Sequence, residues 1–149
     1  MTTLPPILIV TDRGHFVAYH VTSASVPEVI DRAVFSEGTE KISELVTDQA
    51  GRFPSGGTDG HRQSAIERPR LELELQMRCV RHIAERITEL LSTHSGGWAL
   101  AAPGEILQPI LEHLPVELTS RHKLSLPKDL VKIPATEIAD HFLKARQHA

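Results

Sequence analysis

Residues 7–21 read ILIVTDRGHFVAYHV, and this stretch decides the fold. Its first four side chains are all apolar, which is typical of a strand covered on both faces. From residue 16 to residue 21 the side chains alternate between two faces, as they do along a strand. The tripeptide at 12–14 joins the two runs, and Gly14 supplies the positive φ expected of a tight turn. The stretch therefore predicts a β-hairpin whose first strand is buried.

Further elements follow the hairpin along the chain. Residues 26–35 fit either a third strand or a short helical turn, and residues 38–47 have the apolar spacing of a helix. Residues 70–91 predict a longer helix, because apolar side chains recur there at alternating spacings of four and three. This apolar stripe consists of Leu73, Met77, Val80, Ala84, Ile87 and Leu91.

The second half of the chain alternates between strands and helices. Residues 98–102 (WALAA) predict a buried strand, and Pro103 opens the next helix. Residues 116–126 alternate in hydropathy and predict a strand exposed on one face. A last helix begins at Pro134. This order predicts an α/β fold in which helices pack on the faces of a mixed β-sheet.

Length and composition indicate one globular domain. The 149 residues fit a single domain over 1–149, and 40% hydrophobic with 23% charged residues is close to the globular average. No apolar run approaches the ~20 residues that span a bilayer, so no membrane association is expected. Cys79 is the single cysteine, which predicts a reducing, cytoplasmic location. The net charge of −3 argues against a globally basic nucleic-acid-binding protein.

Residues 48–65 (DQAGRFPSGGTDGHRQSA) differ in kind from the rest. They are rich in Gly, Pro, Ser and Asp and poor in apolar side chains, which predicts a flexible loop. Between residues 52 and 86 the lysine and arginine positions are all arginines, the residue suited to bidentate contacts with phosphate. One interpretation is contact with an RNA backbone. The other is a solvated helix face with ion pairs such as Arg81–Glu85.

Signals for catalysis or for a cofactor are weak. The nine histidines show no metal-ligand spacing, and the sequence contains neither a Walker-type phosphate loop nor a GxSxG elbow. No metal or organic cofactor is expected, and an enzyme built on Asp12 and a histidine ranks last. Asp12, Arg13 and Gly14 follow a buried strand, where open α/β sheets bind ligands. The alternative is that the Asp12 side chain caps the backbone amides of the turn.

Several motifs occur in an order that resembles a known family. They are Gly51-Arg52, Ser55-Gly56-Gly57, Arg62-Gln63-Ser64-Ala65 and Val80-Arg81, together with ILIVTDRGHFVAYHV, WALAAP and LPKDLVKIPATEIADHF. This combination is similar to the bacterial host attachment protein family, the bacterial branch of a superfamily that includes the middle domain of archaeal and eukaryotic class-1 release factors. The resemblance spans nearly the whole chain and implies an α/β sandwich of the release-factor middle-domain type.

The resemblance also implies a ribosome-associated role in rescue, termination or hibernation. Release factors carry a Gly-Gly-Gln tip, and this chain keeps the two glycines but has Thr58 in place of the glutamine. That departure argues against peptidyl-tRNA hydrolysis, whereas Pelota-type relatives engage ribosomes without the glutamine. A non-catalytic RNA- or ribosome-binding domain is the leading hypothesis, and a host-interaction or regulatory domain that binds another protein is its rival. The candidate contact residues are Arg52, Gly56, Gly57, Thr58, Arg62 and Arg68.

Overall fold

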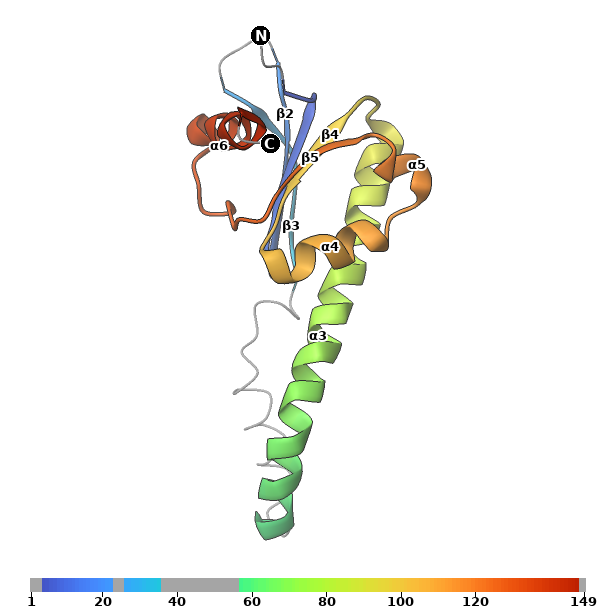
Figure 1. Ribbon diagram of the computed structural model, residues 1–149, viewed down its shortest axis with the longest axis vertical. Helices are drawn as coiled ribbons and strands as arrows, with labels where there is room; N and C mark the ends of the chain where they lie inside the picture. The colour runs from blue at the N-terminus through green and yellow to red at the C-terminus, as the bar shows by residue number, and fades with distance from the viewer. Residues whose placement is uncertain (1–3, 23–25, 36–56, 148–149) are drawn as a thin grey trace.

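The computed structural model of the chain describes residues 4–22, 26–35 and 57–147. A five-stranded sheet forms its centre, with helices on both faces (Figure 1). The strands are β1 (Ile7–Thr11), β2 (His15–His20), β3 (Glu28–Val34), β4 (Trp98–Ala101) and β5 (His122–Leu126). The helices are α3 (Gly57–Thr93), α4 (Gly104–Glu112), α5 (Val116–Thr119) and α6 (Ala135–Gln147). The predicted α/β class is confirmed.

The predicted hairpin is present and contributes the central strand. β1 pairs antiparallel with β2, where Ile9 lies opposite Ala18, and parallel with β4, where Ile9 lies opposite Leu100. β4 also pairs parallel with β5, so the sheet is mixed and has the order β3-β2-β1-β4-β5. Because β1 and β4 have a strand on each side and a helical layer on each face, every residue of both strands is buried.

β3 lies at one edge of the sheet, so the strand alternative for residues 26–35 is confirmed. It pairs antiparallel with β2, and the register shifts between Ala18 and Tyr19. Ile30 and Asp31 lie at this irregularity; Ile30 packs against the core beneath α3, and the carboxylate of Asp31 accepts two hydrogen bonds from Arg86 of α3. An irregular, charged edge strand of this kind resists pairing with other sheets.

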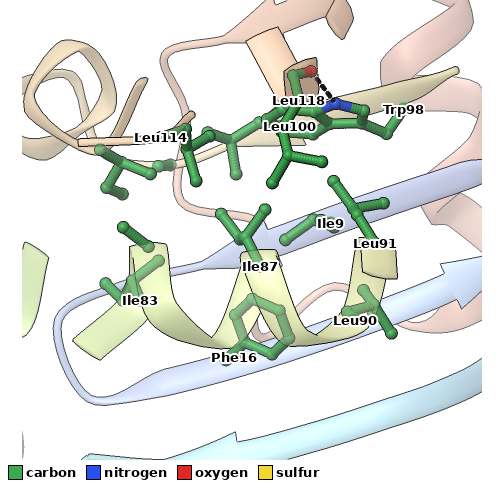
Figure 2. Close-up of a cluster of buried hydrophobic side chains, with 14 of the residues drawn as sticks. Ile9, Phe16, Ile83, Ile87, Leu90, Leu91, Trp98, Leu100, Leu114 and Leu118 are labelled. Atoms are coloured by element: carbon green, nitrogen blue, oxygen red, sulfur yellow. Dashed lines mark hydrogen bonds between the residues drawn. The ribbon is translucent and has the colours of Figure 1, made fainter. Parts of the chain in front are cut away.

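The sheet separates two apolar layers, because alternate residues of each strand face opposite sides. One layer packs beneath α3, α4 and α5 and surrounds Trp98, which is fully buried (Figure 2). The indole Nε1 of Trp98 donates a hydrogen bond to the carbonyl oxygen of Leu118 at 2.8 Å. The other layer packs beneath α6 and contains Ile138 and Phe142, both fully buried.

The predicted strand at 116–126 is wrong in its first half. Residues 116–119 form the short helix α5, and the strand β5 begins at His122. The carbonyl oxygen of Pro115 accepts hydrogen bonds from the amides of Leu118 and Thr119, which closes a helical turn. The segment is so short that its two apolar residues, the exposed Val116 and the buried Leu118, fit a helical turn as well as a strand.

The predicted loop at 48–65 is wrong from Gly57 onward, because α3 begins at that residue. Residues 48–56 lie outside the described residues, as does the helix predicted for 38–47. Once a helix is established, each further residue adds a backbone hydrogen bond, so α3 propagates through a segment of poor helix formers. It runs through Pro69, one residue before the predicted start at Arg70.

The predicted apolar stripe of α3 is buried in its C-terminal part alone. Leu73 is 59% exposed and Met77 is 39% exposed, whereas Leu75 and Cys79 are buried in their place. Leu75 and Cys79 lie on another side of the helix from Leu73 and Met77, so at this level the buried face of α3 is rotated away from the predicted stripe. Toward its N-terminus α3 runs past the end of the sheet (Figure 1). The buried stripe members are Val80, Ala84, Ile87 and Leu91. Within the described ranges, no helix combines the length and the apolar character needed to cross a membrane.

Candidate functional site

A cleft of about 260 Å³ opens at the carboxyl ends of the parallel strands. This is the edge at which open α/β sheets bind ligands. The β1–β2 turn forms one wall, and the segments that follow β4 and β5 form the other. The cleft is lined by Asp12, Arg13, Gly14, His15, Pro103, Glu105 and Asp129. The three strand-end residues singled out from the sequence therefore lie together in it.

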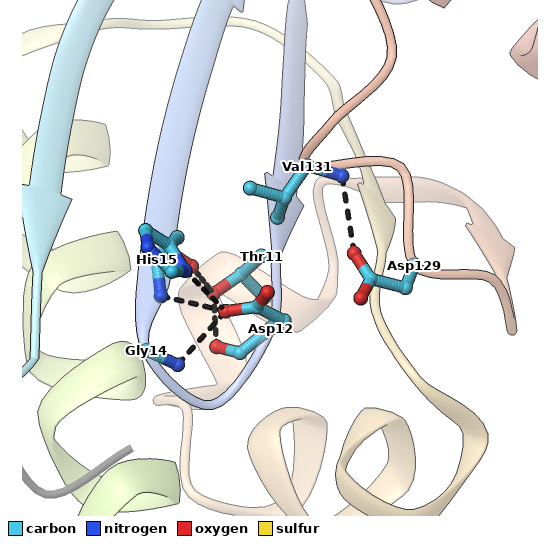
Figure 3. Close-up of polar contacts among 6 residues, drawn as sticks. All are labelled: Thr11, Asp12, Gly14, His15, Asp129 and Val131. Atoms are coloured by element: carbon cyan, nitrogen blue, oxygen red, sulfur yellow. Dashed lines mark hydrogen bonds and ion pairs between the residues drawn. The ribbon is translucent and has the colours of Figure 1, made fainter. Parts of the chain in front are cut away.

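Asp12 closes the β1–β2 turn, which is the capping role predicted as the alternative. Its Oδ1 accepts hydrogen bonds from the amides of Gly14 at 2.8 Å and His15 at 2.7 Å, and it lies 3.1 Å from the Nδ1 of His15 (Figure 3). The buried hydroxyl of Thr11 donates to the carbonyl oxygen of His15 at 2.7 Å. The turn is thus held by a carboxylate and a hydroxyl from its own residues.

The positive φ expected at Gly14 is not found. Within the described part of the chain, Gly96 is the residue with a positive φ, at 98°, just beyond the C-terminus of α3. The Asp12 carboxylate satisfies two amides of the turn, so the backbone closes without a left-handed residue at Gly14.

Arg13 ties the turn to two helices. Its Nη2 donates to Oε1 of Gln76 on α3 at 2.7 Å and lies 3.2 Å from Oε2 of Glu105 on α4. Gln76 in turn donates to the carbonyl oxygen of Glu105 at 3.4 Å. The Nε of Arg13 is buried and has no hydrogen-bond partner among the described residues. This cluster, the Arg13–Gln76–Glu105 clamp, holds α3 near the point where the helix leaves the sheet.

The carboxylates in the cleft also have local structural partners. Oδ1 of Asp129 accepts a hydrogen bond from the amide of Val131 at 3.1 Å, and Glu105 pairs with Arg13 (Figure 3). In the described ranges, no three His, Cys, Asp or Glu side chains are arranged to hold a metal ion. His15 beside Asp12 has the make-up of an acid–base pair, but none of the described residues that line the cleft is a serine, cysteine or lysine. The arrangement supports the fold more directly than it supports catalysis.

The candidate RNA-contact residues that the structure describes lie in a different part of the molecule. Gly57 and Thr58 begin α3, and Arg62 and Arg68 follow in the same helix, whereas Arg52 and Gly56 lie outside the described residues. From Gln76 in the clamp to Gly57 at the tip, α3 extends over about 28 Å at 1.5 Å per residue. The structure therefore separates the strand-end group from the arginine group (Figure 1).

Sequence reasoning missed the long-range contacts that position these elements. Arg86 of α3 binds Asp31 of β3 through two hydrogen bonds, and Arg121 donates to carbonyl oxygens at the C-terminal end of α3. Each pair is separated by more than 25 positions in the chain, so helical or strand periodicity contains no signal for it.

The family model described as protein required for attachment to host cells matches residues 7–142. The chain belongs to this family. No curated protein matches the sequence. The matched region of this host-attachment family member begins at β1 and ends within α6, so it includes the sheet, both helical layers, the cleft and α3.

Proposed function

We propose that this host-attachment family protein is a non-catalytic RNA-binding domain that associates with the ribosome through the N-terminal half of α3. One observation carries the proposal: α3 runs well past the end of the sheet (Figure 1). Leu75 is the most N-terminal buried residue described on α3. Because the helix projects, a large partner can approach it without contacting the rest of the domain.

The arginines on this helix support the proposal. Arg70, which lies in this half of the helix, is exposed, and none of the ion pairs among the described residues uses it. Arg62 and Arg68 lie further along the same helix toward its tip. Arginine binds phosphate through a planar, bidentate guanidinium group, and such contacts need no sequence recognition. The proposed ligand is therefore the sugar–phosphate backbone.

The resemblance to release-factor middle domains supports a ribosomal partner. Thr58, at the position of the tip glutamine, supports binding without hydrolysis of peptidyl-tRNA. The cleft at the strand ends has no part in the proposal, because Arg13 is occupied by Gln76 and Glu105.

Co-sedimentation with ribosomes tests the proposal directly. The wild-type chain and an Arg52/Arg62/Arg68→Gln variant are compared at low and at high salt. For three phosphate contacts, a fourfold rise in salt lowers affinity roughly twentyfold. We expect salt-sensitive pelleting of the wild type and loss of pelleting in the variant.

The matched control is Lys132/Lys144/Arg146→Gln, which removes three positive charges from exposed residues of α6 and the loop before it. We expect the control to pellet as the wild type does. If both variants lost pelleting equally, net charge alone would explain the binding and the proposal would be wrong. Absence of pelleting of the wild type at either salt would also contradict it.

A further inference from the structure

The Arg13–Gln76–Glu105 clamp lies where α3 leaves the packed part of the domain. Leu75 is the most N-terminal buried residue described on the helix, and Gln76 follows it directly, whereas none of the residues 69–74 is buried. Gly57 is about 28 Å from Gln76 along the axis, so a tilt of about 10° at the clamp displaces the tip by about 5 Å. The direction of the projecting half therefore depends on what holds this turn of α3.

The other two members of the clamp lie on fixed supports. Arg13 is part of the β1–β2 turn, which the carboxylate of Asp12 closes through two backbone amides. Glu105 lies in the first turn of α4, a helix that is anchored in the core by Ile106 and Ile110. Both supports are fixed to the sheet and its core, so the clamp transmits their position to α3.

One nitrogen atom of Arg13 links the turn to both helices. Its Nη2 donates to Oε1 of Gln76 at 2.7 Å and lies 3.2 Å from Oε2 of Glu105, whereas the buried Nε has no hydrogen-bond partner among the described residues. Gln76 closes the triangle, because its Nε2 donates to the carbonyl oxygen of Glu105 at 3.4 Å. Gln76 therefore connects α3 to both supports.

We propose that the clamp sets the direction of the projecting half of α3 and prepares it for its ligand, with Arg13 and Gln76 as positioning residues. The consequence for binding rests on the proposed RNA-binding function, whereas the consequence for the helix does not. A helix that is already held in one direction loses less freedom when it binds, and such pre-organisation raises affinity. The edge at which open α/β sheets bind ligands thus holds a helix in this protein.

Loss of the clamp is expected to lower affinity without changing the number of phosphate contacts. The slope of log K against log salt counts these contacts, at about 0.9 for each contact with a duplex and about 0.7 with a single strand. A loosened helix keeps its arginines, so the slope stays the same and affinity falls at every salt concentration. If Arg13 contacted phosphate itself, its removal would flatten the slope by one contact.

Gln76→Leu is the decisive variant, because it removes both hydrogen bonds of Gln76, keeps a good helix former and leaves the net charge unchanged. Purified ribosomes are titrated with the full chain by co-sedimentation at several salt concentrations. We expect Gln76→Leu to bind about threefold to fivefold more weakly than the wild type, with the same salt slope. The matched control is Gln108→Leu, at an exposed glutamine of α4, which is expected to bind as the wild type does.

A double-mutant cycle assigns the effect to the clamp. Arg13→Met is expected to weaken binding as Gln76→Leu does, again with an unchanged salt slope. The double variant is expected to bind no more weakly than either single variant, because the two residues act through one contact. Circular dichroism and urea denaturation confirm that each variant is folded under the conditions of the titration.

A distance measurement tests the clamp without any RNA. Spin labels are attached at Ser64→Cys on α3 and Val116→Cys on α5, in a Cys79→Ala background, and double electron–electron resonance measures the distance between them. Ser64 lies about 18 Å beyond Gln76 along the helix, so a loosened clamp appears as a wider spread of distances. We expect a narrow distribution in the labelled parent and in Gln108→Leu, and a broader one in Gln76→Leu.

The positioning role is overturned if Gln76→Leu has the distance distribution of its parent, or if it binds ribosomes as tightly as a wild type that does bind. A salt slope that flattens in Arg13→Met and not in Gln76→Leu also overturns it, because Arg13 is then a phosphate contact. If the wild type does not pellet with ribosomes, the proposed function fails, and the distance measurement still decides whether the clamp directs α3.

Discussion

Arg121 donates hydrogen bonds at the C-terminal end of α3, where a helix leaves its last carbonyl oxygens without intrahelical partners. Its guanidinium donates to the carbonyl oxygens of Leu91 at 3.2 Å, His94 at 2.5 Å and Gly96 at 2.8 Å. One side chain from the segment before β5 thus fixes both the end of α3 and the turn that leads into β4. A positive charge at this end of the helix is also favoured by the helix dipole.

We expect Arg121→Met to lower the free energy of unfolding by about 1–3 kcal/mol, because it keeps the aliphatic stem and leaves three carbonyl oxygens without their donor. Arg121→Lys is expected to recover less than half of this loss, since one ammonium group cannot reproduce the planar fork of the guanidinium. Urea denaturation measures both changes. A loss under about 0.5 kcal/mol in Arg121→Met would mean that water replaces the guanidinium without cost.

His122 is expected to make stability depend on pH. It lies against Trp98, with ring centroids 4.8 Å apart, and burial lowers the pKa of its imidazole. The unfolded chain therefore binds this proton more readily than the folded chain does. The stabilising contribution of neutral His122 is complete above the unfolded pKa of about 6.5 and is lost as the pH falls toward the folded pKa.

We expect the wild type to lose at most about 1.4 kcal/mol through His122 between about pH 7.5 and pH 5.5. Urea unfolding at the two pH values measures the loss of stability. The His122→Gln variant is expected to lack the part of this loss that comes from protonation of His122. The other histidines remain in the variant, so they provide the internal control. An identical pH dependence in both chains would assign the effect to a different group.

The element that most needs explanation is α3, which is longer than its apolar stripe. Its C-terminal half is stabilised by the core and by Arg86 and Arg121, whereas none of the described side chains before Leu75 is buried, so helix propagation contributes to the N-terminal half. Pro69 lies inside that half and removes one backbone hydrogen bond there. Helices without tertiary contacts are marginally stable in water. The projecting half is therefore the part of α3 that a partner can most readily stabilise.

We expect amide hydrogen exchange along α3 to become faster from residue 79 toward residue 57. Pro69→Ala is expected to slow exchange on both sides of the substitution, because proline costs about 3 kcal/mol in a helix interior relative to alanine. Hydrogen–deuterium exchange with mass spectrometry measures both effects, and peptides from β1 serve as the unaffected control. If Pro69→Ala left exchange unchanged, the projecting half would owe its stability to contacts rather than to propagation.

The same helix shows which features can be predicted from the sequence. The hairpin and β4 are evident because their apolar runs are local and continuous, and the spacing of Val80, Ala84 and Ile87 indicates the buried face of α3. Near Leu75 the buried side of α3 differs from the predicted stripe, and which side is buried depends on how the helix packs against segments that are distant in the chain. For that reason the exposure of Leu73 and Met77 is not visible in the sequence.

The candidate cleft also contains one residue whose role can be predicted from the sequence and one whose role cannot. Asp12 is predictable, because a carboxylate two residues before a glycine at a strand end is a turn signal. Its neighbour Arg13 is not, since its partners Gln76 and Glu105 lie 63 and 92 positions away. Periodicity describes how one element faces the core but does not show which elements come together. The clamp therefore emerges from the structure alone.

At the scale of the whole molecule, one sheet joins two apolar layers. β1 and β4 contribute alternate side chains to both, so neither layer can lose its order without exposing these strands. Trp98, the single tryptophan, lies beneath the α3 side, and Phe142 of α6 is buried on the opposite side. The two positions allow the coupling between the layers to be measured.

We expect Phe142→Ala to destabilise the protein by about 3–5 kcal/mol, as for other large buried aromatic residues. The layers share their central strands, so the fluorescence of Trp98 should report the full shift of the urea midpoint although the substitution lies across the sheet. Far-ultraviolet circular dichroism should give the same midpoint, as expected for two-state unfolding. Ile87→Ala, on the Trp98 side, provides the comparison. If Phe142→Ala shifted the transition seen by circular dichroism and left that of Trp98 in place, the two layers would unfold independently, and the α6 layer would be a separable cover on a sheet stabilised by α3.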